Sequence, residues 1–132
     1  MNIIWIEFAA VIAIHNSEIA EHGGSEGVRD EDLLLSALAR PQNTFAYNDE
    51  ADICDLASAY AFGIAKNHAF VDGNKRTAYV VMRTFLQVND HNIVATPEEK
   101  YLAILGLAEG NISEEEFAKW IRDHLVEITL IS

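Results

Sequence analysis

The residues best suited to chemistry stand together in one short segment, His68 to Arg76, with the sequence HAFVDGNKR. Gly73 is expected at the start of a helix, where free backbone N–H groups and the positive end of the helix dipole bind anions. Lys75 and Arg76 add two formal positive charges at the same point, and arginine can bind phosphate oxygens through two parallel hydrogen bonds. The segment therefore predicts a phosphate-binding site.

Two more residues of this segment could act on a bound phosphate. Asp72 is a carboxylate among anion-binding groups, which makes sense if a divalent cation such as Mg²⁺ bridges it to the phosphate. His68 has no second histidine at metal-ligand spacing, and a lone imidazole suits proton transfer near neutral pH. Phe70, between these polar residues, is expected to point into the core. Taken singly, His68 fits a histidine at a helix C-terminus, Asp72-Gly73-Asn74 fits a turn, and Lys75-Arg76 fits a solvated helix face. Only the combination of these residues favours a reactive site.

The elements that must position this segment are helices, because apolar residues recur at helical spacing along the chain. The first expected helix ends at Gly23-Gly24, and its buried face has Trp5, Phe8, Ala9, Ile12, Ala13, Ile19 and Ala20. The next runs from Asp30 to Leu38 and is stopped by Pro41, and two more run from Ile53 to about His68 and from Asn74 to about Val88. Two further helices are capped at Thr96 and Ser113. The sequence predicts an all-α fold, a compact single-domain bundle of about six helices over residues 1–132.

The connections between these helices are expected to be short. Residues 42–50 have loop-like composition, and residues 69–73 form a turn. The run from Ala78 to Met82 is apolar or aromatic all round, which predicts a helix at the centre of the bundle. Only the tail Ile128-Thr129-Leu130-Ile131 has strand-like composition, and a frayed end explains it equally well.

Composition excludes several other classes of protein. With 132 residues, half of them hydrophobic, the chain can bury a core, but no apolar run is long enough to span a bilayer. The N-terminal residues are not expected to act as a signal peptide, because they lack a basic region and include an acid at Glu7. A net charge of −12 opposes docking on a nucleic acid backbone. The single cysteine, Cys54, fits a cytoplasmic location and is expected to be a buried apolar residue.

The segment from His68 to Arg76 resembles the signature of the Fic/Doc family, His-x-Phe-x-Asp/Glu-Gly/Ala-Asn-x-Arg, at every fixed position. Upstream, His22-Gly23-Gly24, Gly27-Val28-Arg29-Asp30 and the stretch from Leu33-Leu34 to Pro41 resemble the Doc (death-on-curing) branch of that family. The resemblance implies the Fic/Doc fold and a transferase that uses ATP and Mg²⁺.

The resemblance also implies a role for each residue of the segment. His68 would remove a proton from a hydroxyl of a target protein, and Asp72 would hold Mg²⁺. The residues that would line the nucleotide phosphates are Gly73, Asn74, Lys75 and Arg76. Phe45 and Tyr47 fall where family members carry a flap that aligns the target segment.

Two departures bear on which group is transferred. Fic adenylyltransferases have glycine where Lys75 stands and a second arginine where Tyr79 stands. Lysine is the mark of the Doc branch, whose members phosphorylate proteins with the ATP γ-phosphate. The resemblance thus implies a toxin kinase that modifies elongation factor Tu, blocks translation and is inhibited by a Phd-type antitoxin. Adenylylation of a protein hydroxyl and an inactive Fic-fold binding partner are the alternatives.

Overall fold

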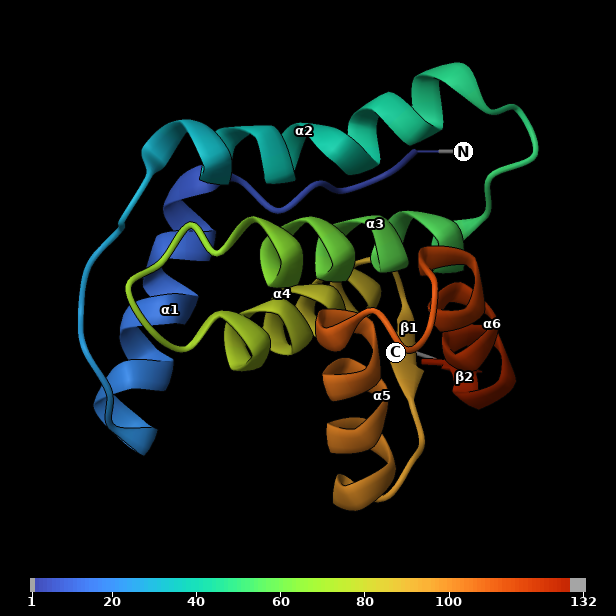
Figure 1. The fold of residues 1–132 in the computed structure, drawn as a ribbon. Coiled ribbons are helices and arrows are strands. Elements are labelled where there is room, and N and C mark those ends of the chain that lie inside the picture. Colours follow the sequence, from blue (N-terminus) through green and yellow to red (C-terminus); the bar gives the residue numbers. More distant parts are fainter. Residues whose placement is uncertain (1, 129–132) are drawn as a thin grey trace.

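Helix α3 (Ile53–Asn67) runs through the middle of the bundle, between α2 (Glu31–Tyr47) and α4 (Asn74–Val88), as Figure 1 shows. Alanine, glycine and serine occupy much of α3, so neighbouring backbones can approach it closely, and it is buried on nearly all sides. The prediction that the helix containing Ala78 to Met82 forms the centre was wrong, since Tyr79 and Val80 of α4 are only half-buried. They face a cavity described below.

The computed structural model describes residues 2–128 and confirms a mostly helical domain. In these residues the elements follow in the order α1 (Phe8–His22), α2, α3, α4, β1 (His91–Ile93), α5 (Pro97–Glu109), α6 (Glu114–His124) and β2 (Leu125–Glu127). The six helices match the predicted number. None of the helices among residues 2–128 is both long and apolar enough to cross a membrane.

Helix α2 continues through Pro41 to Tyr47. The predicted helix end before Pro41 was therefore wrong, and so was the predicted loop over residues 42–47. Proline removes one backbone hydrogen bond, but packing can hold the turn. Pro41 is buried, and the adjacent turn lies tightly against α3: a Cβ at Gly63 would be only 3.1 Å from the Ala37 oxygen. Contact between the two helices keeps α2 regular where the sequence predicts a stop.

Helix α1 begins at Phe8, not at Trp5, and it buries a narrower face than predicted. Its buried residues are Val11, His15 and Ile19, whereas three alanines of the expected face, Ala9, Ala13 and Ala20, are exposed. The helix lies at the side of the bundle (Figure 1), where a single row of residues meets α4. His15, which apolar periodicity overlooks, belongs to that row.

A small antiparallel sheet joins the two ends of the C-terminal region and was not predicted. His91, Asn92 and Ile93 of β1 pair with Glu127, Val126 and Leu125 of β2. Ile128 donates its backbone N–H to Asp90 at 2.9 Å, and the rest of the predicted strand-like tail, Thr129 to Ile131, lies outside the described residues.

The helix caps follow the predictions closely. Asp30 caps α2, and Thr96 and Ser113 form capping boxes with Glu99 and Glu116 at the starts of α5 and α6. Each cap satisfies N–H groups that the first helical turn leaves free. Because such bonds depend on residues three positions apart, the sequence alone locates these helix starts.

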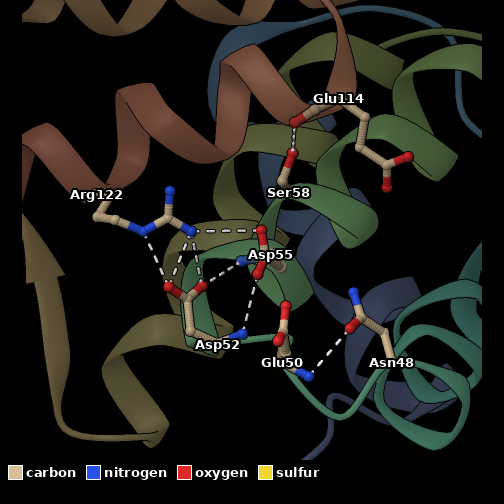
Figure 2. A network of polar contacts seen from close by, with 7 residues as sticks. All are labelled: Asn48, Glu50, Asp52, Asp55, Ser58, Glu114 and Arg122. Carbon is tan, nitrogen blue, oxygen red and sulfur yellow. Dashed lines mark hydrogen bonds and ion pairs between the residues drawn. The ribbon is translucent and has the colours of Figure 1, made fainter.

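Asp52 has two roles at the start of α3, as Figure 2 shows. It forms a capping box with Asp55, and it receives two hydrogen bonds of 2.9 Å from the guanidinium of Arg122 on α6. Partial burial favours a raised pKa for Asp52, but its bonds with Arg122 and the Asp55 backbone outweigh burial and hold the pKa below 3.8. The ion pair ties the C-terminal helix to the central one.

The other end of α6 also contacts α3 and α2. Ser58 of α3 donates its hydroxyl to the Glu114 carbonyl at 2.7 Å (Figure 2), and Arg40 of α2 pairs with the Glu114 carboxylate. Together with the Arg122 ion pair, these contacts make α6 a brace along α3.

Replacing Arg122 by methionine is expected to lower the free energy of unfolding by about 1 kcal/mol, the upper range for a partly exposed ion pair. A carboxylate whose pKa is lowered in the folded state stabilises above its ordinary pKa and loses that effect as pH falls. The difference from wild type should therefore be present at neutral pH, begin to fall near the ordinary carboxyl pKa of 3.8, and vanish once pH lies below the lowered pKa of Asp52.

Urea unfolding at neutral pH and at a pH below the lowered pKa of Asp52 measures this difference in the free energy of unfolding. Lys119→Met is the matched control, because it removes an exposed ion pair with Asp123 on the same helix. Equal effects of the two substitutions at neutral pH would contradict a bracing role for Arg122.

Candidate functional site

The segment from His68 to Gly73 is a turn between α3 and α4, bounded by two residues with left-handed backbone. His68 ends α3 with φ 50° and ψ 45°, an uncommon conformation for a residue with a side chain. Gly73 precedes α4 with φ 76°, where glycine is favoured. The predicted turn and the predicted start of the helix at Asn74 are both confirmed.

Asn74 holds this turn in shape through its side chain. Its Oδ1 accepts the Phe70 N–H, and its Nδ2 donates to the Phe70 carbonyl, both at 3.0 Å. The side-chain amide of Asn74 thus pairs with both the N–H and the carbonyl of Phe70, in the way that the backbone of a neighbouring β-strand would. With its side chain engaged in this way, Asn74 has its backbone N–H left to offer a ligand.

Phe70 is buried, as predicted, and anchors the middle of the turn. Its ring stacks on that of His15 from α1, with centroids 3.8 Å apart. His15 Nε2 also lies 2.8 Å from the Asp72 carbonyl oxygen. One buried histidine therefore fixes two points of the turn, and it was missed because a single polar residue on an apolar helix face gives no signal in the sequence.

A short extended segment before α2 pairs with the same turn. Val28 forms an isolated antiparallel bridge with Phe70, Arg29 donates its N–H to the Ala69 oxygen at 2.7 Å, and Val71 donates to Gly27 at 3.1 Å. The Arg29 guanidinium donates to the backbone oxygens of His68 and Asn67 at 2.8 and 3.3 Å. The upstream residues that resemble the Doc branch thus support the turn.

Asp72 is an exposed carboxylate held by two backbone N–H groups. Oδ2 accepts from Ser25 at 3.2 Å, and Oδ1 accepts from Gly73 at 2.9 Å. These two bonds lower the pKa of Asp72, so the group is ionised at neutral pH. Each oxygen keeps a further lone pair, so the carboxylate can still bind a cation.

A cavity of about 860 Å³ opens beside the turn, with walls from α1, α4 and α5. The residues that line it are Glu18, Glu21 and His22 of α1, His68 to Arg76 without Ala69 and Phe70, Tyr79, Val80 and Arg83 of α4, and Pro97, Lys100, Tyr101 and Ile104 from α5. His68, Asp72, Gly73, Asn74, Lys75 and Arg76 are therefore brought together around one space. Lys75 and Arg76 are exposed, and neither forms an ion pair within residues 2–128.

The backbone at the start of α4 also faces this cavity. Thr77 is the first residue of the helix whose N–H has a main-chain partner, Gly73, at 3.0 Å. The preceding N–H groups are the free donors that every helix start offers. Partial and formal positive charges therefore coincide at this cavity, as the sequence predicts.

Phe45 and Tyr47, predicted as a flap, do not line the cavity. They lie in the last turn of α2, which runs antiparallel to α3, at the end of the bundle opposite His68. Phe45 packs edge-to-face on Trp5, with ring centroids 5.8 Å apart, and Tyr47 is 88 % exposed. The structure thus separates these two residues from the others predicted for the site.

Cys54 is buried, as predicted, and lies outside the cavity. Burial raises the pKa of its thiol to about 12, so the thiolate is scarce at neutral pH. The sequence analysis missed the cavity walls from α1 and α5, because only the folded chain brings Glu18 and Lys100 to the turn.

Comparison with known proteins agrees with this geometry. Residues 5–86, which include the whole turn and nearly all of α4, match the Fic/DOC family. The chain belongs to that family. It is 32 % identical over 112 residues to the protein named protein kinase doc of Escherichia phage P1, covering 85 % of this chain and 88 % of that protein. It is 45 % identical over 74 residues to Toxin Doc of Mycolicibacterium smegmatis, covering 55 % of this chain and 57 % of that protein.

The hydrogen bond from the Ser25 N–H to the Asp72 carboxylate has a testable consequence. Gly24 has φ 117°, and a Cβ there would lie 2.7 Å from Asp72 Oδ2. Gly24→Ala should displace the carboxylate, break the bond from Ser25, and let the pKa of Asp72 rise toward 3.8. NMR titration of the Asp72 carboxyl measures this shift.

Gly23→Ala is the matched control. Gly23 also has positive φ, 85°, but nothing lies within 4 Å of a Cβ there. It should strain the backbone and leave the pKa of Asp72 low. An unchanged Asp72 pKa in Gly24→Ala would mean that this carboxylate is not held by the Ser25 N–H.

Proposed function

We propose that this protein is a toxin kinase of the cytoplasm that transfers the γ-phosphate of ATP to a Ser or Thr hydroxyl of a target protein. We further propose elongation factor Tu as the target, with arrest of translation as the result, and a Phd-type antitoxin as the inhibitor. The observation that carries the proposal is that His68, Asp72 and the cations Lys75 and Arg76 line one cavity at the start of α4.

The phosphates of ATP are expected at the N-terminus of α4. Backbone N–H groups of Gly73 to Arg76 surround this point, although that of Gly73 is bonded to Asp72. Lys75 and Arg76 supply the charge that balances the phosphates, and neither has to break an ion pair with residues 2–128 to do so.

Asp72 is the residue fitted to hold Mg²⁺. Its low pKa keeps it ionised, and it is exposed to the cavity beside the phosphate site. When bound, Mg²⁺ neutralises charge on the phosphate oxygens and on the departing ADP.

His68 is proposed as the general base. It lines the cavity, it is exposed, and among residues 2–128 its imidazole forms no hydrogen bond, while its backbone oxygen accepts a hydrogen bond from Arg29. In the reaction, His68 takes the proton of the target hydroxyl and the hydroxyl oxygen bonds to the γ-phosphorus. The bond from that phosphorus to the bridging oxygen breaks, and ADP leaves with its electron pair.

Lys75 and Tyr79 favour transfer of phosphate over transfer of AMP. Lys75 puts a side chain and a positive charge where glycine would let phosphate lie against the backbone. Tyr79 cannot provide the paired donors by which an arginine would hold the α-phosphate. Both residues line the cavity.

Incubation of elongation factor Tu with this protein, Mg²⁺ and labelled ATP tests the proposal. ATP labelled at the γ-phosphate should transfer its label, and ATP labelled at the α-phosphate should not. His68→Ala should lower the rate by about 10²- to 10⁴-fold, the usual cost of losing a general base. His91→Ala, on β1 and away from the cavity, is the control for histidine loss.

Transfer of the α-label by the wild-type protein would show that the protein is an adenylyltransferase and not a kinase. Undiminished transfer by the His68→Ala variant would show that His68 is not the general base. Lack of transfer of either label would favour the third possibility, a Fic-fold partner without turnover on this target.

A further inference from the structure

The C-terminal end of α3 is closed by a side chain and not by the backbone. At the ends of α1, α2, α4 and α5, the residue that follows the helix donates its N–H to a carbonyl of the last turn. Within residues 2–128, the N–H of His68 makes no such bond at the end of α3. The last carbonyls of α3 therefore need donors from elsewhere, and the guanidinium of Arg29 provides them.

Arg29 binds the carbonyl oxygens of three successive residues. Its Nε donates to His68 at 2.8 Å, and its Nη2 donates to Asn67 at 3.3 Å. Its backbone N–H donates to Ala69 at 2.7 Å. The planar guanidinium carries both side-chain donors in one rigid group, so it fixes the two acceptors relative to each other. A positive charge at a helix C-terminus is favourable as well.

These bonds hold the backbone on both sides of the His68 Cα. The Asn67 carbonyl belongs to the peptide group before His68, and the His68 carbonyl belongs to the peptide group after it. Because each peptide group is planar, holding both of them holds φ and ψ of His68 and the direction of its Cα–Cβ bond. That φ is 50°, a value that a residue with a side chain keeps only where its surroundings impose it.

The position of the His68 imidazole depends on this backbone. Among residues 2–128 the imidazole forms no hydrogen bond, and the residue is exposed. Arg29 does not line the cavity, so it can affect a reaction there only through the turn. We propose that Arg29 is a positioning residue, whose guanidinium keeps His68 left-handed and so directs the imidazole to the target hydroxyl. This inference rests on the proposed role of His68 as the general base.

Two substitutions in the full chain test this role. Arg29→Met keeps a side chain of similar length and the main-chain bond to Ala69, but removes the guanidinium. Arg29→Lys keeps the charge but lacks the planar pair of donors. The kcat for γ-phosphate transfer should fall about 10- to 100-fold in Arg29→Met, as expected for a displaced catalytic group, and less in Arg29→Lys. The dissociation constant for Mg-ATP, measured by calorimetry, should not change, because Arg29 lies outside the cavity.

NMR relaxation gives a second readout that does not require activity. In the wild-type protein the His68 amide should have an order parameter of about 0.85, as in rigid backbone, and in Arg29→Met it should fall toward about 0.6. The Phe70 amide is held by Asn74 and should stay rigid in both proteins. A change confined to His68 distinguishes a lost position from a general loosening of the turn.

Arg40→Met is the matched control. Arg40 also joins two helices through its guanidinium, but it binds the carboxylate of Glu114 and lies outside the cavity. This variant should keep the wild-type kcat and the wild-type order parameter of His68. A loss of stability caused merely by removing an arginine that joins two elements would appear in this variant too.

Four results would overturn the proposal. They are a rigid His68 amide in Arg29→Met, an unchanged kcat in that variant, a parallel loss of kcat and Mg-ATP affinity, and a wild-type kcat in Arg29→Lys. The last result would mean that charge alone is sufficient. The proposed kinase activity fails separately: if the wild-type protein transfers no phosphate, the order parameter of His68 still decides whether Arg29 holds this residue.

Discussion

The paired hydrogen bonds between the Asn74 side chain and the Phe70 backbone are the constraint on which the site depends. They close the turn on itself, so that left-handed residues can stand at both of its ends, His68 and Gly73. Phe70 is then directed into the core, and the polar residues on either side of it emerge into the cavity. A side-chain amide thus sets the backbone that every proposed catalytic group shares.

Support for this turn comes from parts of the chain far apart in sequence. His15 of α1 stacks on Phe70, and Arg29, in the segment before α2, donates hydrogen bonds to backbone oxygens at the end of α3. At its other end α3 is braced by Arg122 of α6, which lies beyond the residues that match the family. The central helix is therefore fixed at both ends, and this rigidity favours a turn that is formed before any nucleotide binds.

The sequence predicted what is local. Capping residues three positions apart located the starts of several helices, and the segment from His68 to Arg76 brought its own turn residues, charges and helix start. The sequence prediction failed where a contact with a residue far away in the chain determines the local structure. Pro41 remains helical because α2 packs on α3 near Gly63, and His15 is buried because Phe70 lies against it. Phe45 was placed in a loop that the packing of α2 converts into helix.

Hydrogen exchange of the nucleotide-free protein tests most directly whether the turn is preformed. The Phe70 amide, bonded to Asn74, should exchange slowly, whereas the amide of Lys75, in the first turn of α4, should exchange quickly. The Val71 amide, bonded to Gly27, should be protected with that of Phe70. If the Phe70 amide exchanged as fast as that of Lys75, the turn would form only with its ligand, and the account of a preformed site would be wrong.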